Sequence, residues 1–476
     1  MKTKAKQSFT EGGLFFKILF FALPVMATSV LQILYNSADN IVVGQFSGDP
    51  EALAAIGCTA ALVNIITNLL IGTSSGAGVV SAQFLGAGRR DRVASTVHTA
   101  MTVSVIGGIA FMLIGLLIHR PVLSFIVSEE SIFEKAALYV FIICFGIPAT
   151  AIYNFGSAIL RSVGDSKTPL TILMISGLIN VLLNLVFVIT FKMSIAGVAL
   201  ATILSQYASA VAVTVILMRA NGEAHHFDIR KMGIDRGIFK RMLIIGIPAG
   251  LQSSAYSLSN IFIVAGINTF DRPYISANTI AGNLDNILYV SMVAFTQSAM
   301  TSAGQNYGAG NEKRIKRTLL YTIVQSIGVG LIISTAIFLL KEPIIKLFVE
   351  PGDPLYNEVI AASVRWVSFF IFPYIICGVF EVLAGFLRGI GNSAAPMAIV
   401  IFCCCLTRII WVSAVFPYLP HEIESLIACY PISWTLSVIA ALFVLIYSTR
   451  RLKATLAAYK TRDEEDGATK NAPAEA

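Results

Sequence analysis

Charged residues are scarce in this chain: Asp, Glu, Lys and Arg together make up 13% of its 476 residues, about half of the share in an ordinary soluble protein. Hydrophobic residues make up 56%. This composition argues against a soluble enzyme, a nucleic-acid-binding protein, a secreted disulfide-stabilised protein and a fibrous protein. It is typical of a polytopic membrane protein.

Side chains that bind metals or act as nucleophiles are also sparse. The chain has five histidines, none at the centre of an apolar stretch, and its seven cysteines lie in or beside apolar stretches without metal-ligand spacing. We interpret these cysteines as small buried apolar side chains. The sequence contains no His-Glu-x-x-His or Gly-x-Ser-x-Gly motif, and its two Gly-Ala-Gly turns lack the Lys-Ser/Thr pair of a phosphate-binding loop. We expect no catalytic residues, no metal centre and no cofactor.

Long apolar stretches, separated by short polar or Gly/Pro-rich breaks, fill most of the chain. About 20 mainly apolar residues suffice for a helix to cross the hydrocarbon core of a bilayer. The sequence therefore predicts an all-α polytopic membrane protein with twelve transmembrane helices. The predicted spans are 14–46, 52–85, 93–118, 132–160, 168–191, 195–219, 238–269, 274–306, 318–340, 357–387, 395–417 and 425–449.

Two motifs occur once in each half of the chain. The segment Gln83-Phe-Leu-Gly-Ala-Gly88 recurs as Gln305-Asn-Tyr-Gly-Ala-Gly310, and Arg161-Ser-Val-Gly-Asp-Ser-Lys-Thr-Pro169 recurs as Arg388-Gly-Ile-Gly-Asn-Ser-Ala-Ala-Pro396. Since each half holds an even number of spans, both halves enter the membrane from the same side. The repeat predicts two pseudo-symmetric six-helix lobes around a central cleft.

Polar breaks divide the chain into five predicted parts. These are an N-terminal segment (1–13), a first lobe (14–219), a linker (220–237), a second lobe (238–451) and a disordered tail (452–476). Lys and Arg are concentrated in alternate loops, on the side that would hold both termini. The positive-inside rule then places both termini and the linker in the cytoplasm.

Three acidic residues, Asp39, Asp285 and Glu381, fall within predicted spans. An ionisable side chain in a span is a candidate functional site, because a charge is costly to place in lipid. Asp39 is the strongest candidate, since residues three and four apart share one side of a helix. Its face also carries a set of polar side chains, namely Gln32, Tyr35 and Asn36.

The two halves differ in charge at this position. Aligning Tyr35-Asn-Ser-Ala-Asp39 with Tyr256-Ser-Leu-Ser-Asn260 places an amide where the first half has a carboxylate. Further polar residues in the first half, one helical turn apart, are the pairs Asn180 with Asn184 and Thr202 with Gln206. These groups can hydrogen-bond a carboxylate or coordinate a small cation. The alternative is that they join helices and take no part in transport.

The other two acidic residues leave several roles open. Glu381 lies seven residues before Arg388, so an ion pair and a substrate contact are both possible roles. Asp285 could line the cleft or pair with Arg365 or Arg408, which lie within spans. The residues that we predict to line the substrate cleft are Gln32, Gln206, Gln252, Tyr256, Asn260, Asp285 and Glu381.

These features resemble the multidrug and toxin extrusion (MATE) family of secondary transporters, in its bacterial branch. The resemblance covers about residues 14–450, and it is carried by Leu23-Pro24, by Tyr35-Asn-Ser-Ala-Asp39-Asn-Ile-Val-Val-Gly44 and by the duplicated motifs. It implies a V-shaped pair of lobes in the bacterial plasma membrane. It also implies export of cationic or amphiphilic small molecules by antiport against H+ or Na+.

The resemblance also implies which residues couple the ion. In relatives with an acidic first-lobe site, the cation is handled by Asp in the first span, Asn and Asp in the fifth, and Thr in the sixth. The matching residues here are Asp39, Asn180, Asn184 and Thr202, with Tyr35 and Asn36 beside them. Asn184 departs from the pattern, because such relatives carry a carboxylate there, so both H+ and Na+ stay open. The seventh span has Gln252 near the place where another branch carries a glutamate.

Two other transporter classes are alternatives. A flippase or exporter of lipid-linked precursors shares the wider superfamily, but such proteins often carry several basic residues in the cleft, whereas only Arg365 and Arg408 lie within spans here. The major facilitator fold also has six plus six spans, but its loop signature fits residues 86–93 poorly. We expect a monomer whose partners are small molecules, H+ or Na+, and the lipid bilayer, with no nucleic acid.

Overall fold

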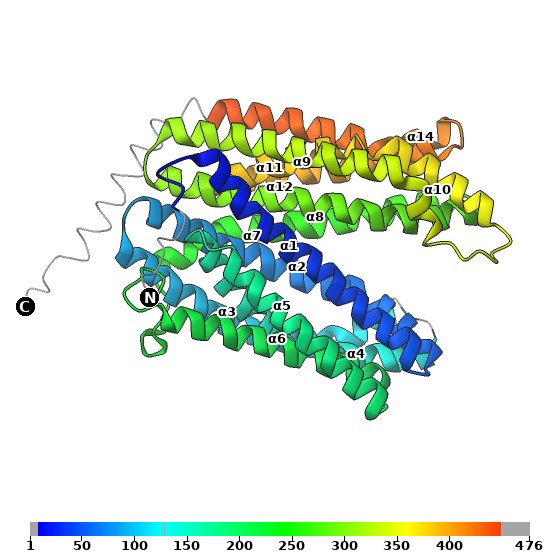
Figure 1. Cartoon of the computed structure of the whole chain (residues 1–476), viewed down its shortest axis with the longest axis horizontal. Helices are drawn as coiled ribbons and strands as arrows, with labels where there is room; N and C mark the ends of the chain where they lie inside the picture. The colour runs from blue at the N-terminus through cyan, green and yellow to red at the C-terminus, as the bar shows by residue number, and fades with distance from the viewer. Residues whose placement is uncertain (1–7, 126, 128, 449–476) are drawn as a thin grey trace, which may run out of the picture.

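The computed structural model describes residues 8–125, 127 and 129–448. Within these residues every regular element is helical. The tail predicted at 452–476 and the first seven residues of the N-terminal segment lie outside the described part of the chain. Figure 1 shows the helices running alongside one another in two groups, with the first half of the chain in one group and the second half in the other.

Six helical paths form the first half, and their bounds agree with the predicted spans to within several residues. The fifth path ends in a π-helical turn, η1, directly after Asn184. The elements are α1 (Leu14–Phe46), α2 (Pro50–Gly86), α3 (Arg90–Ser124), α4 (Glu130–Ser162), α5 (Lys167–Asn184), η1 (Leu185–Thr190) and α6 (Ser194–Arg219).

Six more paths form the second half. The predicted span 357–387 is broken at Pro373, where α10 and α11 meet at a bend of 47°, because proline cannot donate a helical hydrogen bond. The elements are α7 (Arg236–Ile267), α8 (Arg272–Gly308), α9 (Glu312–Lys346), α10 (Tyr356–Phe370), α11 (Tyr374–Gly389), α12 (Ala394–Ile399), η3 (Val400–Leu406), α13 (Thr407–Ile410), η4 (Trp411–Val415), η5 (Phe416–Tyr418) and α14 (Ile423–Ile427), after which the last path continues to Ser448.

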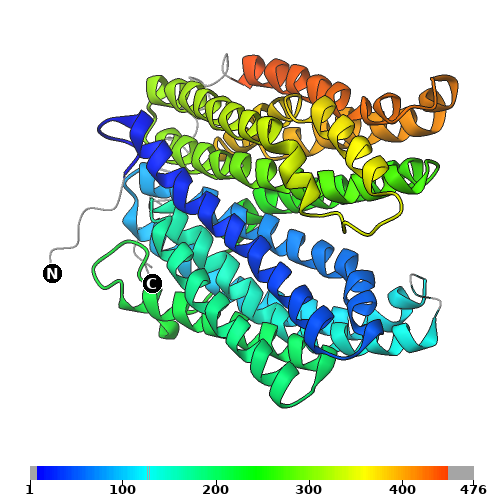
Figure 2. The same cartoon turned by 45° about the vertical axis from the view of Figure 1, so that its right-hand side comes forward.

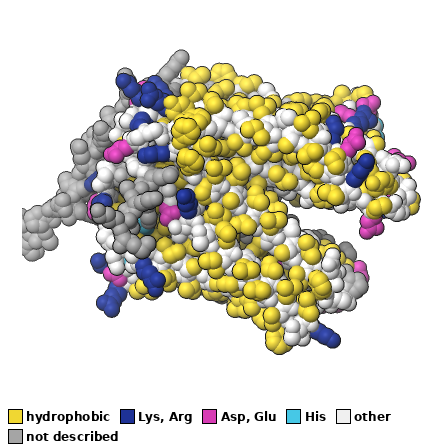
Figure 3. Space-filling model, in the orientation of Figure 1, with side chains coloured by type: hydrophobic (Ala, Val, Ile, Leu, Met, Phe, Trp, Pro, Cys, Tyr) yellow, Lys and Arg dark blue, Asp and Glu magenta, His cyan; other side chains and the backbone are white. Residues whose placement is uncertain are grey.

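The surface suits a bilayer. By length and apolar content, nine of the described helices can cross a membrane, and the bent pair α10 and α11 makes a tenth. α7 and α8 are long enough, with 32 and 37 residues, but they contain more polar side chains. Large apolar side chains such as Leu117, Leu339 and Phe443 are exposed. Figure 3 shows apolar side chains covering the middle of the visible face and charged ones gathered toward its two ends.

Helices α1 and α7 each pack into both halves of the molecule. The first part of α1, with Ile18 and Phe21, is buried in a core with Phe295 and Phe380 of the second half. Its last part, around Val43, is buried among first-half residues instead. Figures 1 and 2 show α1 crossing diagonally from one group of helices to the other.

Helix α7 of the second half is divided between the two halves in the same way as α1. The first part of α7, with Ile238 and Met242, is buried with Val79 of the first half. Its last part, with Ile263 and Ile267, is buried in a second-half core. Each lobe is therefore completed by half a helix from the other repeat.

The duplicated Gln/Gly motifs join the two halves at one end of the bundle, which we call the linker end because residues 220–235 lie there. Gln83 donates from Nε2 to the carbonyl oxygen of Gly389 at 2.9 Å, and Gln305 donates to that of Ser162 at 2.7 Å. Ser162 and Gly389 are the last residues of α4 and α11, and each directly follows the arginine that begins the second duplicated motif. The two bonds are therefore related by the repeat. Sequence analysis interpreted the motifs as turns and as evidence of the internal repeat, and it missed this contact.

Two glycines let the helices approach closely there. A Cβ on Gly86 would lie 1.8 Å from the carbonyl oxygen of Gln305, and a Cβ on Gly308 would lie 1.8 Å from that of Gln83. Only glycine can occupy these positions without moving the backbone. At the opposite end, which we call the open end, Figure 3 shows a hollow between the two lobes. The lobes thus meet at the linker end and separate at the open end.

We expect Gly308→Ala to destabilise the protein by about 1–3 kcal/mol, because an added methyl group must displace backbone in a close-packed contact. The matched control is Gly282→Ala on the same helix, where an added Cβ meets nothing within 4 Å and should be neutral or stabilising by up to about 1 kcal/mol. The measurement is the melting temperature of each purified variant in detergent. Equal melting temperatures for the two variants would contradict the tight crossing.

Candidate functional site

Asp39 lies in the last part of α1 and faces α5 and α6. Its side chain accepts hydrogen bonds from Nδ2 of Asn184 at 2.5 Å and from Oγ1 of Thr202 at 3.2 Å. Asp39 is 7% exposed, and Asn180 and Asn184 are fully buried. Asn184 also donates to Oδ1 of Asn180, one turn earlier, at 3.2 Å. Four of the residues singled out in the sequence therefore form one buried polar cluster.

Local structure places these side chains. Asn180 and Asn184 lie one turn apart on α5, so they share a face, and the π-helical turn η1 begins directly after Asn184. Thr202 also donates to the carbonyl oxygen of Val198 on its own helix at 2.9 Å. π-helical turns such as η1 widen a helix locally and occur often at functional sites. The cluster thus lies where α5 changes its winding.

Two polar atoms of the cluster lack a hydrogen-bond partner among the described residues. They are Nδ2 of Asn180 and Oδ1 of Asn184. Buried polar atoms are nearly always bonded to protein, water or an ion. Asn184 and Thr202 present donors to the carboxylate of Asp39, and the oxygens of these side chains could also surround a small cation. The cluster is therefore able to hold a proton on Asp39 or a monovalent cation beside it.

The other first-half candidates take different places. The hydroxyl groups of Tyr35 and Ser205 are hydrogen-bonded, which ties α1 to α6 one turn from Asp39. Gln32 is exposed. Gln206 lies against α4, since a Cβ on Gly146 would lie 2.3 Å from its Oε1. The side chain of Asn36 lies outside the described part of the structure.

In the second half, the counterpart of Asp39 faces a cation. Arg408 of α13 donates from Nη1 to Oδ1 of Asn260 at 3.2 Å and to Oγ of Ser259 at 3.4 Å. Tyr256 lies one turn before Asn260, with its ring centroid 6.0 Å from the Arg408 guanidinium carbon. The aligned positions thus have opposite electrostatic surroundings.

Two of the remaining second-half candidates, Gln252 and Glu381, lie near the same cation, Arg388. Gln252 accepts a hydrogen bond from Arg388 at 2.7 Å. Glu381 is 5% exposed, and no described basic group lies within ion-pair distance of it or of Asp285. Arg365 instead pairs with Glu422 and Glu424 at the surface.

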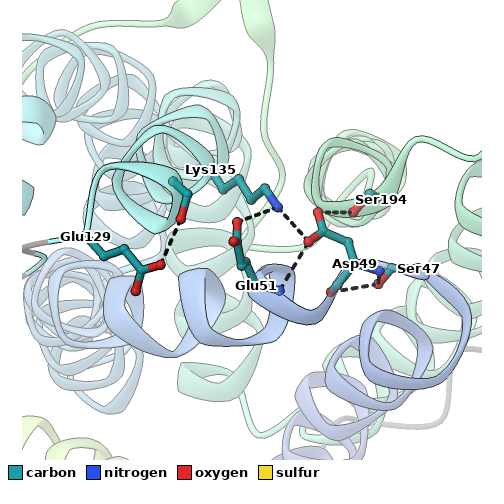
Figure 4. Close-up of polar contacts among 7 residues, drawn as sticks. Ser47, Asp49, Glu51, Glu129, Lys135 and Ser194 are labelled. Atoms are coloured by element: carbon teal, nitrogen blue, oxygen red, sulfur yellow. Dashed lines mark hydrogen bonds and ion pairs between the residues drawn. The ribbon is translucent and has the colours of Figure 1, made fainter.

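At the open end, charged and polar side chains of the first lobe form a network of ion pairs and hydrogen bonds (Figure 4). Asp49 caps α2 by accepting from the backbone N–H of Glu51 at 3.1 Å. Lys135 of α4 lies 2.6 Å from the Asp49 carboxylate and 2.8 Å from that of Glu51. Ser194, at the start of α6, also donates to Asp49, at 3.3 Å. The ammonium group of Lys135 holds the pKa of Asp49 below its ordinary value.

Sequence analysis missed this network, although its local part is visible as the Asp49-Pro50-Glu51 helix start. Asp before Pro is a common beginning of a helix. Lys135 is far away in the sequence, so no local pattern connects it to Asp49. The network ties α2, α4 and α6 together at the open end.

The MatE family model matches residues 24–186 and 248–412, which is most of both lobes. The chain belongs to the MatE family. The resemblance found in the sequence is therefore confirmed, and so is an all-helical membrane transporter rather than an enzyme. One match falls in each half, so the internal repeat coincides with two copies of the family's unit.

Curated relatives of this chain are named as probable multidrug resistance proteins and as an FAD transporter. The chain is 28% identical over 384 residues to "Probable multidrug resistance protein YpnP" of Bacillus subtilis, covering 80% of this chain and 84% of that protein. It is 25% identical over 394 residues to "Probable multidrug resistance protein NorM" of Thermotoga maritima, covering 80% and 82%. It is 25% identical over 360 residues to the "FAD transporter" of Shewanella oneidensis, covering 74% and 76%.

Solved MatE structures share the whole fold. An outward-facing multidrug resistance MATE transporter of the MOP superfamily superposes with a TM-score of 0.85 at 20% identity, covering 95% of this chain and 99% of that one. A MOP superfamily transporter from Pyrococcus furiosus, described as having a binding pocket of reverse polarity, superposes with a TM-score of 0.84 at 20% identity, with the same coverage. The predicted two-lobe architecture is confirmed.

We expect Lys135→Met to lower the melting temperature at neutral pH, because it removes the partner of the Asp49 carboxylate. The pKa of Asp49 is lowered in the folded state, so its contribution to stability is present above the unfolded value of about 4 and is lost as the pH falls below it. The difference from wild type should therefore shrink below pH 4 and in high salt. Lys346→Met is the control, because Lys346 is exposed and has no ion pair among the described contacts. A difference that is the same at pH 3.5 and pH 7 would contradict this role.

Proposed function

We propose that this transporter exports cationic or amphiphilic small molecules across the bacterial plasma membrane in exchange for H+ or Na+, and that Asp39 couples the two movements. The observation that carries the proposal is the buried Asp39 carboxylate between α1, α5 and α6, held by Asn184 and Thr202. Relatives named as multidrug resistance proteins support small-molecule export. The relative named as an FAD transporter supports a cargo range beyond simple cations.

The coupling follows from what ion binding does to the hydrogen bonds of Asp39. An ionised carboxylate accepts strong bonds from Asn184 and Thr202. A proton or Na+ neutralises it and weakens those bonds, so the last part of α1 is held less firmly against α5 and α6. Because the first part of α1 is packed in the other lobe, a shift at Asp39 is transmitted across the cleft.

Pro24 lies near the end of the first part of α1, directly before Val25, and it removes one helical hydrogen bond from the helix. Thr28 donates to the carbonyl oxygen of Pro24 at 2.7 Å. The helix can therefore bend there at lower cost. In our proposal the open end faces outward and both termini lie in the cytoplasm. The ion-loaded state releases cargo at the open end. Release of the ion to the cytoplasm then returns the cleft to its starting state.

The available driving force is adequate for one coupling charge. A potential of 100 mV supplies about 2.3 kcal/mol for each elementary charge moved. Each 1.4 kcal/mol corresponds to a tenfold ratio, so one ion exchanged for a cargo without net charge supports roughly fifty-fold accumulation. A monovalent cationic cargo exchanged for one ion moves no net charge, and its export is driven by the H+ or Na+ concentration gradient alone. Among the described residues, the cluster contains a single carboxylate, which matches one monovalent ion in each cycle.

The alternative, a flippase for lipid-linked precursors, would need several basic residues to hold a diphosphate. Arg365 pairs with Glu422 and Glu424 at the surface. Of these two arginines only Arg408 is then left for such a role, and one guanidinium is fewer cations than a diphosphate site needs. These placements favour the antiporter.

We expect Asp39→Asn to abolish gradient-driven efflux, because an amide cannot be neutralised by a proton and binds Na+ more weakly than a carboxylate. The measurement is efflux of a fluorescent organic cation from vesicles under an imposed pH gradient and, separately, an imposed Na+ gradient. The gradient that drives the wild type identifies the coupling ion.

The control is Asp91→Asn, which removes an exposed carboxylate at the start of α3 and should leave efflux unchanged. Efflux that continues at the wild-type rate in Asp39→Asn would remove Asp39 from the coupling role. Loss of efflux in both variants would show that the effect is not specific to Asp39.

A further inference from the structure

Arg408 is a buried cation with no counter-charge. Its side chain is 2% exposed, and none of the described carboxylates forms an ion pair with it. Its hydrogen-bond partners among the described residues are neutral oxygens: Ser433 at 3.2 Å from Nε, and Ser259 at 3.4 Å and Asn260 at 3.2 Å from Nη1. Buried charges in proteins are normally paired, because leaving one unpaired is costly.

The surroundings of Arg408 strengthen the case for a missing partner. Its guanidinium carbon lies 4.5 Å from the ring centroid of Tyr430 and 6.0 Å from those of Tyr256 and Trp434. These rings exclude water, and a low local polarity strengthens the attraction to an anion. Nη2 has no hydrogen bond among the described residues, so two of the five N–H donors of the guanidinium are unused.

The nearby acids do not supply the partner. Glu381 lies near Arg388 and Tyr256 and not within ion-pair distance of Arg408. Asp285 forms no ion pair either. The other ionisable groups near Arg408 are cysteine and tyrosine side chains, none of which is an acid that ionises at neutral pH; they are Tyr256, Cys377, Cys404, Cys405, Cys429 and Tyr430.

The site is the repeat counterpart of the ion-coupling cluster. Asp39 and Asn260 are aligned positions, on α1 and α7, and each receives a donor from the fifth path of its own half: Asn184 for Asp39 and Arg408 for Asn260. Asn260 is exposed whereas Arg408 is buried, so the site reaches the surface through Asn260. The two lobes therefore offer opposite charges at equivalent places.

We infer that Arg408 binds an anionic group of the transported compound, such as a carboxylate, sulfonate or phosphate. The inference rests on the proposed transport function and narrows its cargo to zwitterionic amphiphiles: the cationic group is drawn toward the lobe of Asp39 and the anionic group toward Arg408. A compound with only a cationic group leaves Arg408 unpaired and binds more weakly.

The test uses two fluorescent dyes that differ in one group. Rhodamine 110 carries a carboxylate beside its cationic ring system, and rhodamine 123 is its methyl ester. Binding to the purified full chain, in nanodiscs of neutral phosphatidylcholine, is measured by fluorescence anisotropy. We expect the wild type to bind rhodamine 110 about tenfold more tightly, the difference expected for one charge-assisted hydrogen-bonded contact.

The preference should disappear in Arg408→Gln and persist in Arg408→Lys. It should also persist in the control Arg365→Gln, which removes a cation that is already paired at the surface. Equal binding of the two dyes by the wild type, no binding of either, or a preference that survives in Arg408→Gln would each overturn the inference.

Two further measurements need no Arg408 variant. Benzoate should displace rhodamine 110 from the wild type, whereas uncharged benzamide at the same concentration should not; equal effects would overturn the inference. Adding phosphatidylglycerol to the nanodiscs should not displace the dye, and displacement would assign Arg408 to a lipid headgroup instead. Asp39→Asn should keep the dye preference even though it loses gradient-driven efflux, so failure of the coupling role and failure of the anion site are distinguishable.

Discussion

The packing of α1 and α7 into both halves is the constraint on which the rest of the structure depends. A helix whose two parts are buried in different cores cannot follow one lobe as a rigid body. When the lobes move relative to each other, α1 and α7 must bend or slide. Pro24 and Pro248 lie where such bending costs least. A small change of hydrogen bonding at Asp39 therefore acts on a helix that is anchored in the opposite lobe.

The repeat provides two equivalent scaffolds, and the two halves use them differently. At the linker end the symmetry is kept: Gln83 and Gln305 make matching bonds, and Gly86 and Gly308 make matching close approaches. In the middle of the bundle the symmetry is kept in the backbone and broken in the charges, with a carboxylate in the first half and a guanidinium in the second. Closure of the linker end is thus shared by the halves, whereas ion and cargo chemistry are divided between them.

Much of this could be predicted from the sequence. The apolar stretches gave the helical paths, because the membrane imposes a length and a composition on each. The spacing of Asn180 and Asn184 predicted that the two side chains share one face of a helix, and the structure joins them by a hydrogen bond. Of the polar face predicted around Asp39, Tyr35 is bonded to Ser205 and Gln32 is exposed. The contact of Asp39 with Asn184 and Thr202 came from the family resemblance, since no local pattern relates helices so distant in the sequence.

What could not be predicted depends on long-range packing. The packing of α1 and α7 into both halves leaves no local sequence pattern, because a helix has the same kind of buried apolar residues whether it packs against its own half or the other. The Gln/Gly motifs indicated turns, but the contacts of their glutamine side chains could not be predicted. The acceptors are backbone carbonyl oxygens, which every residue has, so no residue type marks them in the sequence. Arg408 was visible as a charge within a span, but its aromatic neighbours come from two other helices. The bend between α10 and α11 was within reach of sequence analysis, because Pro373 marks it.

The crossing of α1 also bears on the order in which the protein is made. The backbone N–H of Phe9 donates to the side chain of Gln305, and Phe9 shares a core with residues as late as Leu445. Partners so far apart are joined slowly, since a long loop of chain must close first. The leading part of the first helix therefore stays without its final neighbours until most of the second half has been synthesised, and the two halves mature together rather than in succession.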